Sequence, residues 1–255
     1  MARIGFLGTG AIAEAMVRGL DGLGHDILVS ERNAATAQRL ARDFAGVSVA
    51  ANAEVVAQSD IVILCLMSGI AERVLPDLPF HADHKVISVM ADMPRERLAA
   101  LIPDVADLSL TIPLPSIATG GCPLPVWPDT GSVRTVFGDR NPVIAVESEA
   151  ALNAHFGACA VSLPVMALLR TGVDWLAAQT GDRAGAEIYV TAMFGAYFAA
   201  MRKDGSGGID TLMADLGTEG GLNDSLRNTM AQAGAPDALL EGLDGLRERL
   251  GLPPA

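Results

Sequence analysis

The chain has 255 residues, of which half are hydrophobic and 19% are charged, and this is the composition of a folded globular protein. Its formal net charge of −12 argues against binding to nucleic acid or to anionic lipid, because both of these partners are negatively charged. The three cysteines, Cys65, Cys122 and Cys159, lie far apart without Cys-x-x-Cys spacing, so we expect a reducing cytoplasm and neither a disulfide framework nor a metal site.

The first half of the sequence alternates short strands with helices. Strand patterns at 4–7 and 26–29 flank a helix over 11–20, and a second helix, which Asn33 can cap, covers about 34–44. This alternation predicts a Rossmann-type parallel sheet with helices on its faces. Further strands are predicted at 47–49, 61–66, 86–89 and 108–110.

The segment 113–128 is rich in proline and predicts a loop with an edge strand through Val126 and Trp127. A helix over 132–137 and a last strand over 143–146 then complete the predicted sheet.

Strand signals end after Glu147, and helices are predicted over 148–157, 165–179 and 183–202. We therefore expect a dinucleotide-binding domain at 1–147 and an all-helical dimerisation domain at 148–255. The last predicted helix places five leucines on one face: Leu239, Leu240, Leu243, Leu246 and Leu250.

The predicted helix that carries Tyr189, Phe194 and Phe198 is apolar all round, so it requires cover on every side. A helical domain of this size can hardly provide that cover alone, which predicts a homodimer or a higher homo-oligomer, with a central helix of a monomeric bundle as the alternative. The longest apolar run, at 188–201, has 14 residues and is too short to cross a bilayer, and the N-terminus shows no signal peptide. We expect a soluble cytoplasmic protein.

Residues 8–13 read Gly-Thr-Gly-Ala-Ile-Ala and match the G-x-G-x-x-A pattern directly between a predicted strand and a predicted helix. In this setting Gly8 permits a tight turn, Gly10 lets a diphosphate approach the backbone, and Ala13 allows close packing of helix on strand. The helix that begins with Ala11 and Ile12 offers amide hydrogens to the phosphates. The sequence predicts an NAD(P)-dependent oxidoreductase.

The residues after the second predicted strand bear on the choice between NAD and NADP. Glu31 stands where an acidic residue would bind a ribose 2′-hydroxyl, which favours NAD. Arg32 can pair with a 2′-phosphate, and Ser30 and Asn33 can donate further hydrogen bonds, which favours NADP. We expect NADP, with NAD as the alternative.

Three segments carry a family resemblance. The opening 3–15, the segment 86–91 and the segment 218–223, which reads Thr-Glu-Gly-Gly-Leu-Asn, resemble in order and spacing the corresponding motifs of pyrroline-5-carboxylate reductases. The third is similar to that family's [S/T]-P-G-G-x-T motif at the start of a helix and is the most specific of the three.

The resemblance implies a reductase of a cyclic imine carboxylate, built as an interleaved helical homodimer with each active site between a Rossmann domain and helices of the dimer. It places Gly220 and Gly221 where bare amide hydrogens would bind a substrate carboxylate. Asn223, in place of the family's hydroxyl residue, would accept a hydrogen bond from the ring N–H, and Thr218 would cap the turn or touch the carboxylate. The resemblance also places four residues beside the nicotinamide half of the cofactor: Leu66, Met67, Ala91 and Pro113.

The chain departs from the family pattern at three places. The M-P-N-T-P loop is replaced by 112–116, the G-S-G-P-A-Y segment has no counterpart, and the sequence at 67–69 differs. These departures leave open another imine or keto substrate and a nucleotide-sensing protein without turnover. A β-hydroxyacid dehydrogenase would need a lysine on the helical domain that neither Lys85 nor Lys203 supplies, and a deazaflavin-linked NADP reductase would have no reason to keep the Gly-Gly-Leu-Asn turn.

Overall fold

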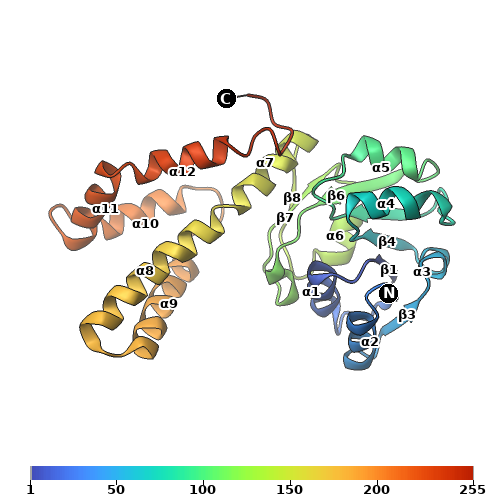
Figure 1. The fold of residues 1–255 in the computed structure, drawn as a ribbon, viewed down its shortest axis with the longest axis horizontal. Coiled ribbons are helices and arrows are strands. Elements are labelled where there is room, and N and C mark those ends of the chain that lie inside the picture. Colours follow the sequence, from blue (N-terminus) through green and yellow to red (C-terminus); the bar gives the residue numbers. More distant parts are fainter. Residues whose placement is uncertain (1, 255) are drawn as a thin grey trace. The chain divides into compact units, whose positions relative to one another are not determined.

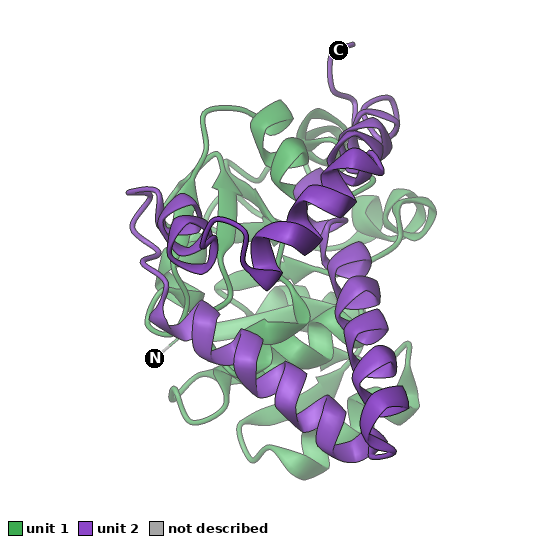
Figure 2. Cartoon of the chain, turned by 90° about the vertical axis from the view of Figure 1, so that its left-hand side faces the viewer, with its two compact units in different colours: residues 1–156 green, residues 157–255 purple. Residues whose placement is uncertain are grey.

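The computed structural model describes residues 2–254, and the chain divides into two compact units. Residues 1–156 form a Rossmann unit and residues 157–255 form a helical unit, drawn in separate colours in Figure 2. The division falls inside the helix α7 (Glu149–Cys159), some residues beyond the boundary expected after Glu147.

The Rossmann unit contains an eight-stranded sheet in the order β3-β2-β1-β4-β5-β6-β7-β8 (Figure 1). The pairs are parallel except β6 with β7, which are antiparallel. Within this sheet the order reverses between β2 and β4, on the two sides of β1, which is the switch point of a Rossmann fold. The strands are β1 Arg3–Leu7, β2 Asp26–Ser30, β3 Val47–Ala50, β4 Ile61–Leu64, β5 Lys85–Ser88, β6 Asp107–Thr111, β7 Leu124–Trp127 and β8 Val143–Ala145.

Helices cover both faces of the sheet, and each face has its own apolar cluster. In β4, Ile61 and Ile63 belong to one cluster, and Val62 and Leu64 to the other. A strand that is buried on both faces has this unbroken apolar sequence because neither set of side chains meets water. The helices are α1 Ala11–Leu20, α2 Ala34–Asp43, α3 Asn52–Gln58, α4 Ser68–Val74, α5 Arg95–Leu101 and α6 Ser132–Phe137, with short 3-10 turns at Leu75–Asp77 and Pro115–Ala118.

Two details of the predicted sheet were wrong. The strand through Val126 and Trp127 lies between β6 and β8 rather than at an edge. Pro125 has no N–H to donate to a neighbouring strand, and its carbonyl accepts a hydrogen bond from the Thr111 hydroxyl at 2.7 Å, so the strand tolerates this proline. The strand predicted at 61–66 ends at Leu64, so that Cys65 and Leu66 lie in the following loop.

The helical unit has a small core of its own. Helices α8 (Ser162–Thr180) and α9 (Arg183–Ala200) pack against each other, and the buried hydrophobic side chains among residues 157–254 are Val173, Ala186 and Val190. Three shorter helices follow, and the last of them ends earlier than predicted, so that Leu246 and Leu250 lie in turns beyond it. These helices are α10 Gly208–Leu216, α11 Leu222–Gln232 and α12 Ala235–Asp244.

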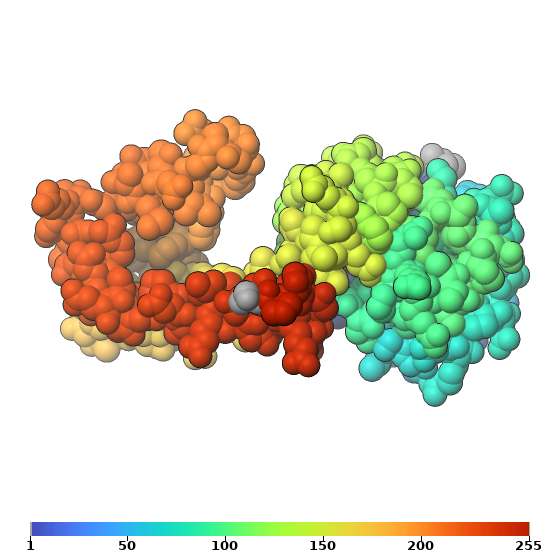
Figure 3. Space-filling model, turned by 90° about the horizontal axis from the view of Figure 1, so that it is seen from above, coloured from blue at the N-terminus to red at the C-terminus, as the bar shows by residue number. Residues whose placement is uncertain are grey.

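Large apolar side chains of the helical unit face solvent. Ile188 is 69% exposed and Leu222 is 91% exposed, and Trp175 and Tyr189 are also exposed. In the space-filling view of Figure 3 the orange and red segments of this unit leave a hollow between them. In this monomer the apolar helix α9 therefore lacks the cover that its sequence requires.

One stretch of the described residues, Glu149–Thr180, is long and apolar enough to cross a membrane by length and composition alone. No such stretch is expected from uninterrupted apolar runs in the sequence, because Asn153, His155 and Arg170 interrupt this one. Only 11% of its most apolar window is buried in the monomer.

Candidate functional site

The turn between β1 and α1 has the geometry of a diphosphate cradle. Gly8 has φ +100°, and a Cβ atom there would lie 2.4 Å from the carbonyl oxygen of Cys65, so only glycine fits this position. Gly10 begins α1 without a side-chain cap, and a Cβ added to it would meet no atom within 4 Å. The space beside Gly10 is therefore open, and the first amide hydrogens of α1 have neither an intrahelical partner nor a side-chain cap from Gly10, which suits a bound diphosphate.

Ser30, the last residue of β2, and Asn33, in the β2–α2 connection that follows, form hydrogen bonds to this turn. Ser30 is 1% exposed, and its hydroxyl accepts a hydrogen bond from the Gly8 N–H at 2.8 Å. The Asn33 amide donates to the Thr9 carbonyl at 3.3 Å, and its oxygen caps α2 by accepting from the Thr36 N–H. The cap confirms a prediction, but the expectation that Ser30 donates to a 2′-phosphate does not fit its burial.

The remaining residues of this connection face solvent at the carboxyl end of β2. Glu31 and Arg32 are both exposed. In the first turn of α1, Glu14 pairs with Arg39 of α2 at 2.5 Å and with Arg18 at 3.4 Å. These two arginines compensate the carboxylate of Glu14 near the helix N-terminus, where an uncompensated carboxylate would repel a diphosphate.

The loops after β4 and β5 lie at the same carboxyl edge of the sheet. Met67 and Ala91 are exposed there, and a hydrogen bond of 2.8 Å from the Ser68 hydroxyl to the Asp92 carboxylate joins the two loops. Among the other residues assigned to the nicotinamide half, Leu66 is partly buried and packs on the core, whereas Pro113 is buried in the loop after β6. Burial of the thiol raises the pKa of Cys65, which makes it a poor nucleophile.

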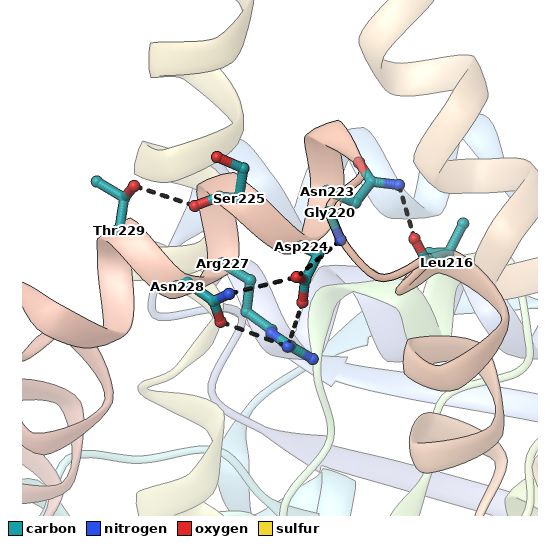
Figure 4. Close-up of polar contacts among 8 residues, drawn as sticks. All are labelled: Leu216, Gly220, Asn223, Asp224, Ser225, Arg227, Asn228 and Thr229. Atoms are coloured by element: carbon teal, nitrogen blue, oxygen red, sulfur yellow. Dashed lines mark hydrogen bonds and ion pairs between the residues drawn. The ribbon is translucent and has the colours of Figure 1, made fainter.

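In the helical unit, the turn before α11 carries the residues predicted to bind substrate (Figure 4). Thr218 accepts at its carbonyl a hydrogen bond of 2.9 Å from the Gly221 N–H, and Gly220 donates its N–H to the Asp224 carboxylate at 3.4 Å. The amide nitrogen of Asn223 donates to the Leu216 carbonyl at 3.1 Å. The amides of Gly220 and Gly221 are thus engaged within the chain rather than bare.

Sequence reasoning missed two side chains beside this turn. Asp224 forms an ion pair with Arg227, and both line a cavity of about 230 Å³. The sequence does contain a signal for Asp224, because this residue directly follows the Gly-Gly-Leu-Asn segment. It is the third residue of a helix, where an acidic side chain interacts favourably with the helix dipole. The cavity is lined by Met213, Leu216, Gly217, Asn223, Asp224 and Arg227.

Comparisons with known proteins agree with this architecture. A family model described as "NADP oxidoreductase coenzyme F420-dependent" matches residues 3–92, and no curated protein matches the sequence. Among solved structures, 1-pyrroline-5-carboxylate reductase from Streptococcus pyogenes is 19% identical with a TM-score of 0.80, and 98% of each chain is covered.

Two further solved structures with bound cofactor are similar to this chain. A pyrroline carboxylate reductase from Plasmodium falciparum with NADP bound is 13% identical, with a TM-score of 0.79 and 98% of this chain and 97% of that chain covered. A reductive aminase from Aspergillus terreus, in complex with NADPH4, cyclohexanone and allyl amine, is 17% identical, with a TM-score of 0.63 and coverage of 99% and 88%. The chain therefore has, over nearly its whole length, the fold of pyrroline-5-carboxylate reductases.

Proposed function

We propose that this chain is a divergent member of the pyrroline-5-carboxylate reductase family, an NADP(H)-dependent enzyme that reduces the C=N bond of a small cyclic imine. The observation that carries the proposal is the coexistence, in one chain, of an open Gly8–Gly10 turn and a helical unit of the same fold as those reductases. Either feature alone also occurs in unrelated proteins.

The residues of the Rossmann unit suit NADP. The N-terminus of α1 would hold the diphosphate over Gly10, and Arg32 would pair with a 2′-phosphate. Two of the similar structures contain NADP or NADPH4. When bound, the nicotinamide supplies the hydride.

The helical unit would orient the substrate. A protonated imine needs little acid–base help, so the chain chiefly has to position its two reactants. The amide nitrogen of Asn223 is held by the Leu216 carbonyl, and its oxygen is therefore the atom that would accept a hydrogen bond from the ring N–H.

The same unit supports a homodimer. The side chains of Leu163, Trp175 and Ile188 are exposed on helices α8 and α9, although water contact makes such exposure unfavourable. An apolar groove of about 600 Å³ runs between α8 and α12 and would receive side chains of a second copy. Cover by a second copy also accounts for the apolar stretch Glu149–Thr180 without a membrane.

The direct test is the oxidation of NADPH and NADH by the full-length chain with five- and six-membered cyclic imines. We expect imine-dependent oxidation that is faster with NADPH. Tight NADPH binding without turnover of any imine would contradict the proposal and favour a nucleotide-sensing protein.

An Asn223→Ala variant sharpens this test. We expect turnover to fall by about one to two orders of magnitude while the NADPH affinity stays unchanged, because in the proposed site the Asn223 amide oxygen contacts the substrate and not the cofactor. The matched control is Thr229→Ala, which alters an exposed residue of the same helix and should leave turnover unchanged. Equal turnover of the two variants would remove Asn223 from the site.

A second candidate rests on the family model that matches residues 3–92, whose description names coenzyme F420. A chain of that kind would transfer hydride between NADP and a deazaflavin. The assay distinguishes the two readily, because a deazaflavin would support NADPH oxidation in the absence of any imine.

A further inference from the structure

We infer that the substrate of this chain carries no carboxylate, because the glycine amides before α11 that the resemblance assigns to that group are engaged within the chain, one of them by the carboxylate of Asp224. The inference rests on the proposed reduction of a C=N bond and narrows its substrate class to imines without an acidic group. It departs from the imine carboxylate that the sequence resemblance implied.

The first support is the hydrogen bonding of the turn (Figure 4). A helix N-terminus binds an anion through amide hydrogens that lack a partner. Here Gly220 donates to the Asp224 carboxylate and Gly221 donates to the Thr218 carbonyl. The side chain of Asp224 is only 16% exposed, so this carboxylate is held in place rather than free in solvent.

The nearest cation is engaged as well. Arg227 pairs with Asp224, and the same guanidinium donates to the Asn228 amide oxygen at 3.4 Å. The amide nitrogen of Asn228 donates in turn to Asp224 at 3.3 Å. A substrate carboxylate would have to displace Asp224 from three donors before it could bind here.

Charges in the surrounding sequence act in the same direction. Residues 202–227 contain five acidic residues and three basic ones, Arg202, Lys203 and Arg227, so this segment has a net charge of −2 and weakly disfavours an anion relative to a protonated imine. The five are Asp204, Asp210, Asp215, Glu219 and Asp224.

The cavity beside the turn has the matching chemistry. Its volume of about 230 Å³ is small, and Met213 and Leu216 provide apolar wall. Asp224 contributes the one carboxylate that lines it. A small hydrocarbon ring with a protonated C=N group would bury its carbon atoms against this wall and keep its charge near that carboxylate.

The Rossmann unit provides independent support. At the carboxyl edge of β4 and β5, on the side of the switch point where the nicotinamide half would bind, the exposed carboxylate is that of Asp92, fixed by Ser68. This edge also favours a cationic or neutral substrate over an anionic one.

Helix stabilisation alone does not account for this arrangement. Asp210 and Asp237 occupy the same third position in α10 and α12, so an acidic residue there has a general role in these helices. Asp224 differs from Asp210 and Asp237 because it lines the cavity and accepts a hydrogen bond from the Gly220 N–H. Asp237 is thus a matched control of the same residue type at the same helix position.

The test compares two imines that differ in one substituent, 2-methyl-1-pyrroline and 1-pyrroline-2-carboxylate, with NADPH and the full-length chain. We expect kcat/KM of the wild type to favour the methyl compound by at least about tenfold. Asp224→Asn keeps an acceptor for Gly220 but removes the charge and releases Arg227, so it should reduce that preference by about tenfold. Asp237→Asn should leave the preference unchanged.

A wild type that prefers the carboxylate, or an Asp224→Asn variant with an unchanged preference, would overturn the inference. If neither imine is reduced, the proposed function fails. The inference is then tested separately by calorimetric titration of the chain with pyrrolidine and with L-proline in the presence of NADP⁺. Binding of pyrrolidine but not of L-proline would uphold it. Binding of L-proline at least as tight as that of pyrrolidine, or binding of neither, would overturn it.

Discussion

The Rossmann unit buries side chains such as Phe6, Ile63 and Leu98 completely on the two faces of its sheet, whereas the helical unit leaves Trp175, Ile188 and Leu222 in solvent. Both units are rich in apolar residues, but only the first provides enough of its own surface to cover them. A sheet with helices on both faces forms two apolar cores within one chain. The long helices α8 and α9 bury only a few side chains along the line where they contact each other. The exposed apolar side chains of the second unit therefore support the proposed homodimer, whereas the first unit covers its own core.

The largest expected effect follows from placing a charge on the uncovered helix. Ile188→Glu should weaken the proposed homodimer by about 4 kcal/mol, roughly a thousandfold in the dissociation constant, because each copy would bury an unpaired carboxylate. Analytical ultracentrifugation measures this. The matched control is Val49→Glu, an exposed apolar residue of the Rossmann unit, which should leave the oligomeric state unchanged. If both variants sediment like the wild type, Ile188 is not in an interface.

A smaller effect concerns the support of the dinucleotide turn. Ser30→Ala should lower the free energy of unfolding by about 2 kcal/mol, because the buried Gly8 N–H loses its acceptor. Since Ser30 acts through the loop, the affinities for NADPH and NADH should fall by the same factor. A loss confined to NADPH would instead mean that Ser30 contacts the 2′-phosphate.

The smallest effect is a pH dependence of the Rossmann unit. His84 is buried, its Nδ1 accepts from the His81 N–H at 3.0 Å, and its Nε2 lies 3.0 Å from the Val56 carbonyl. Desolvation, with a further contribution from His81, lowers the pKa of His84 below its ordinary value, and desolvation lowers that of His25 as well.

A folded-state pKa below the unfolded value means that the unfolded chain takes up protons first as the pH falls. Stability should therefore decrease below about pH 6.5, by at most about 1.4 kcal/mol per pH unit for each histidine. Denaturant unfolding at pH 7.5 and pH 5.5 measures this. His84→Gln should be less stable at pH 7.5 but less sensitive to acid, and an acid sensitivity equal to that of the wild type would exclude His84 as its source.

The sequence predicted most of the Rossmann unit because local signals and tertiary structure agree there. Helix α1 begins and ends where its pattern indicated, and the Asn33 cap is present. The apolar run at 61–66 could not show where β4 ends, because Cys65 and Leu66 remain apolar in the loop. The interior position of β7 was also hidden, since the proline of that strand is typical of an edge.

The candidate site was predictable only where backbone geometry sets the residue type. Gly8 and Gly10 could be assigned because a tight turn and a close approach require glycine. The burial of Ser30 and the pairing of Asp224 with Arg227 depend on side chains that meet in space, and a pattern of residue types does not specify those contacts. The homodimer and the domain boundary remain predictions.

The most direct test of the account is a titration of Gly10→Val with NADPH. Gly10 has φ −79°, which any residue adopts, and open space surrounds the position of its missing Cβ. The free energy of unfolding of the variant should equal that of the wild type within about 0.5 kcal/mol, and the variant should bind NADPH at least a hundredfold more weakly. An unchanged NADPH affinity in the folded variant would show that the diphosphate does not lie at this turn.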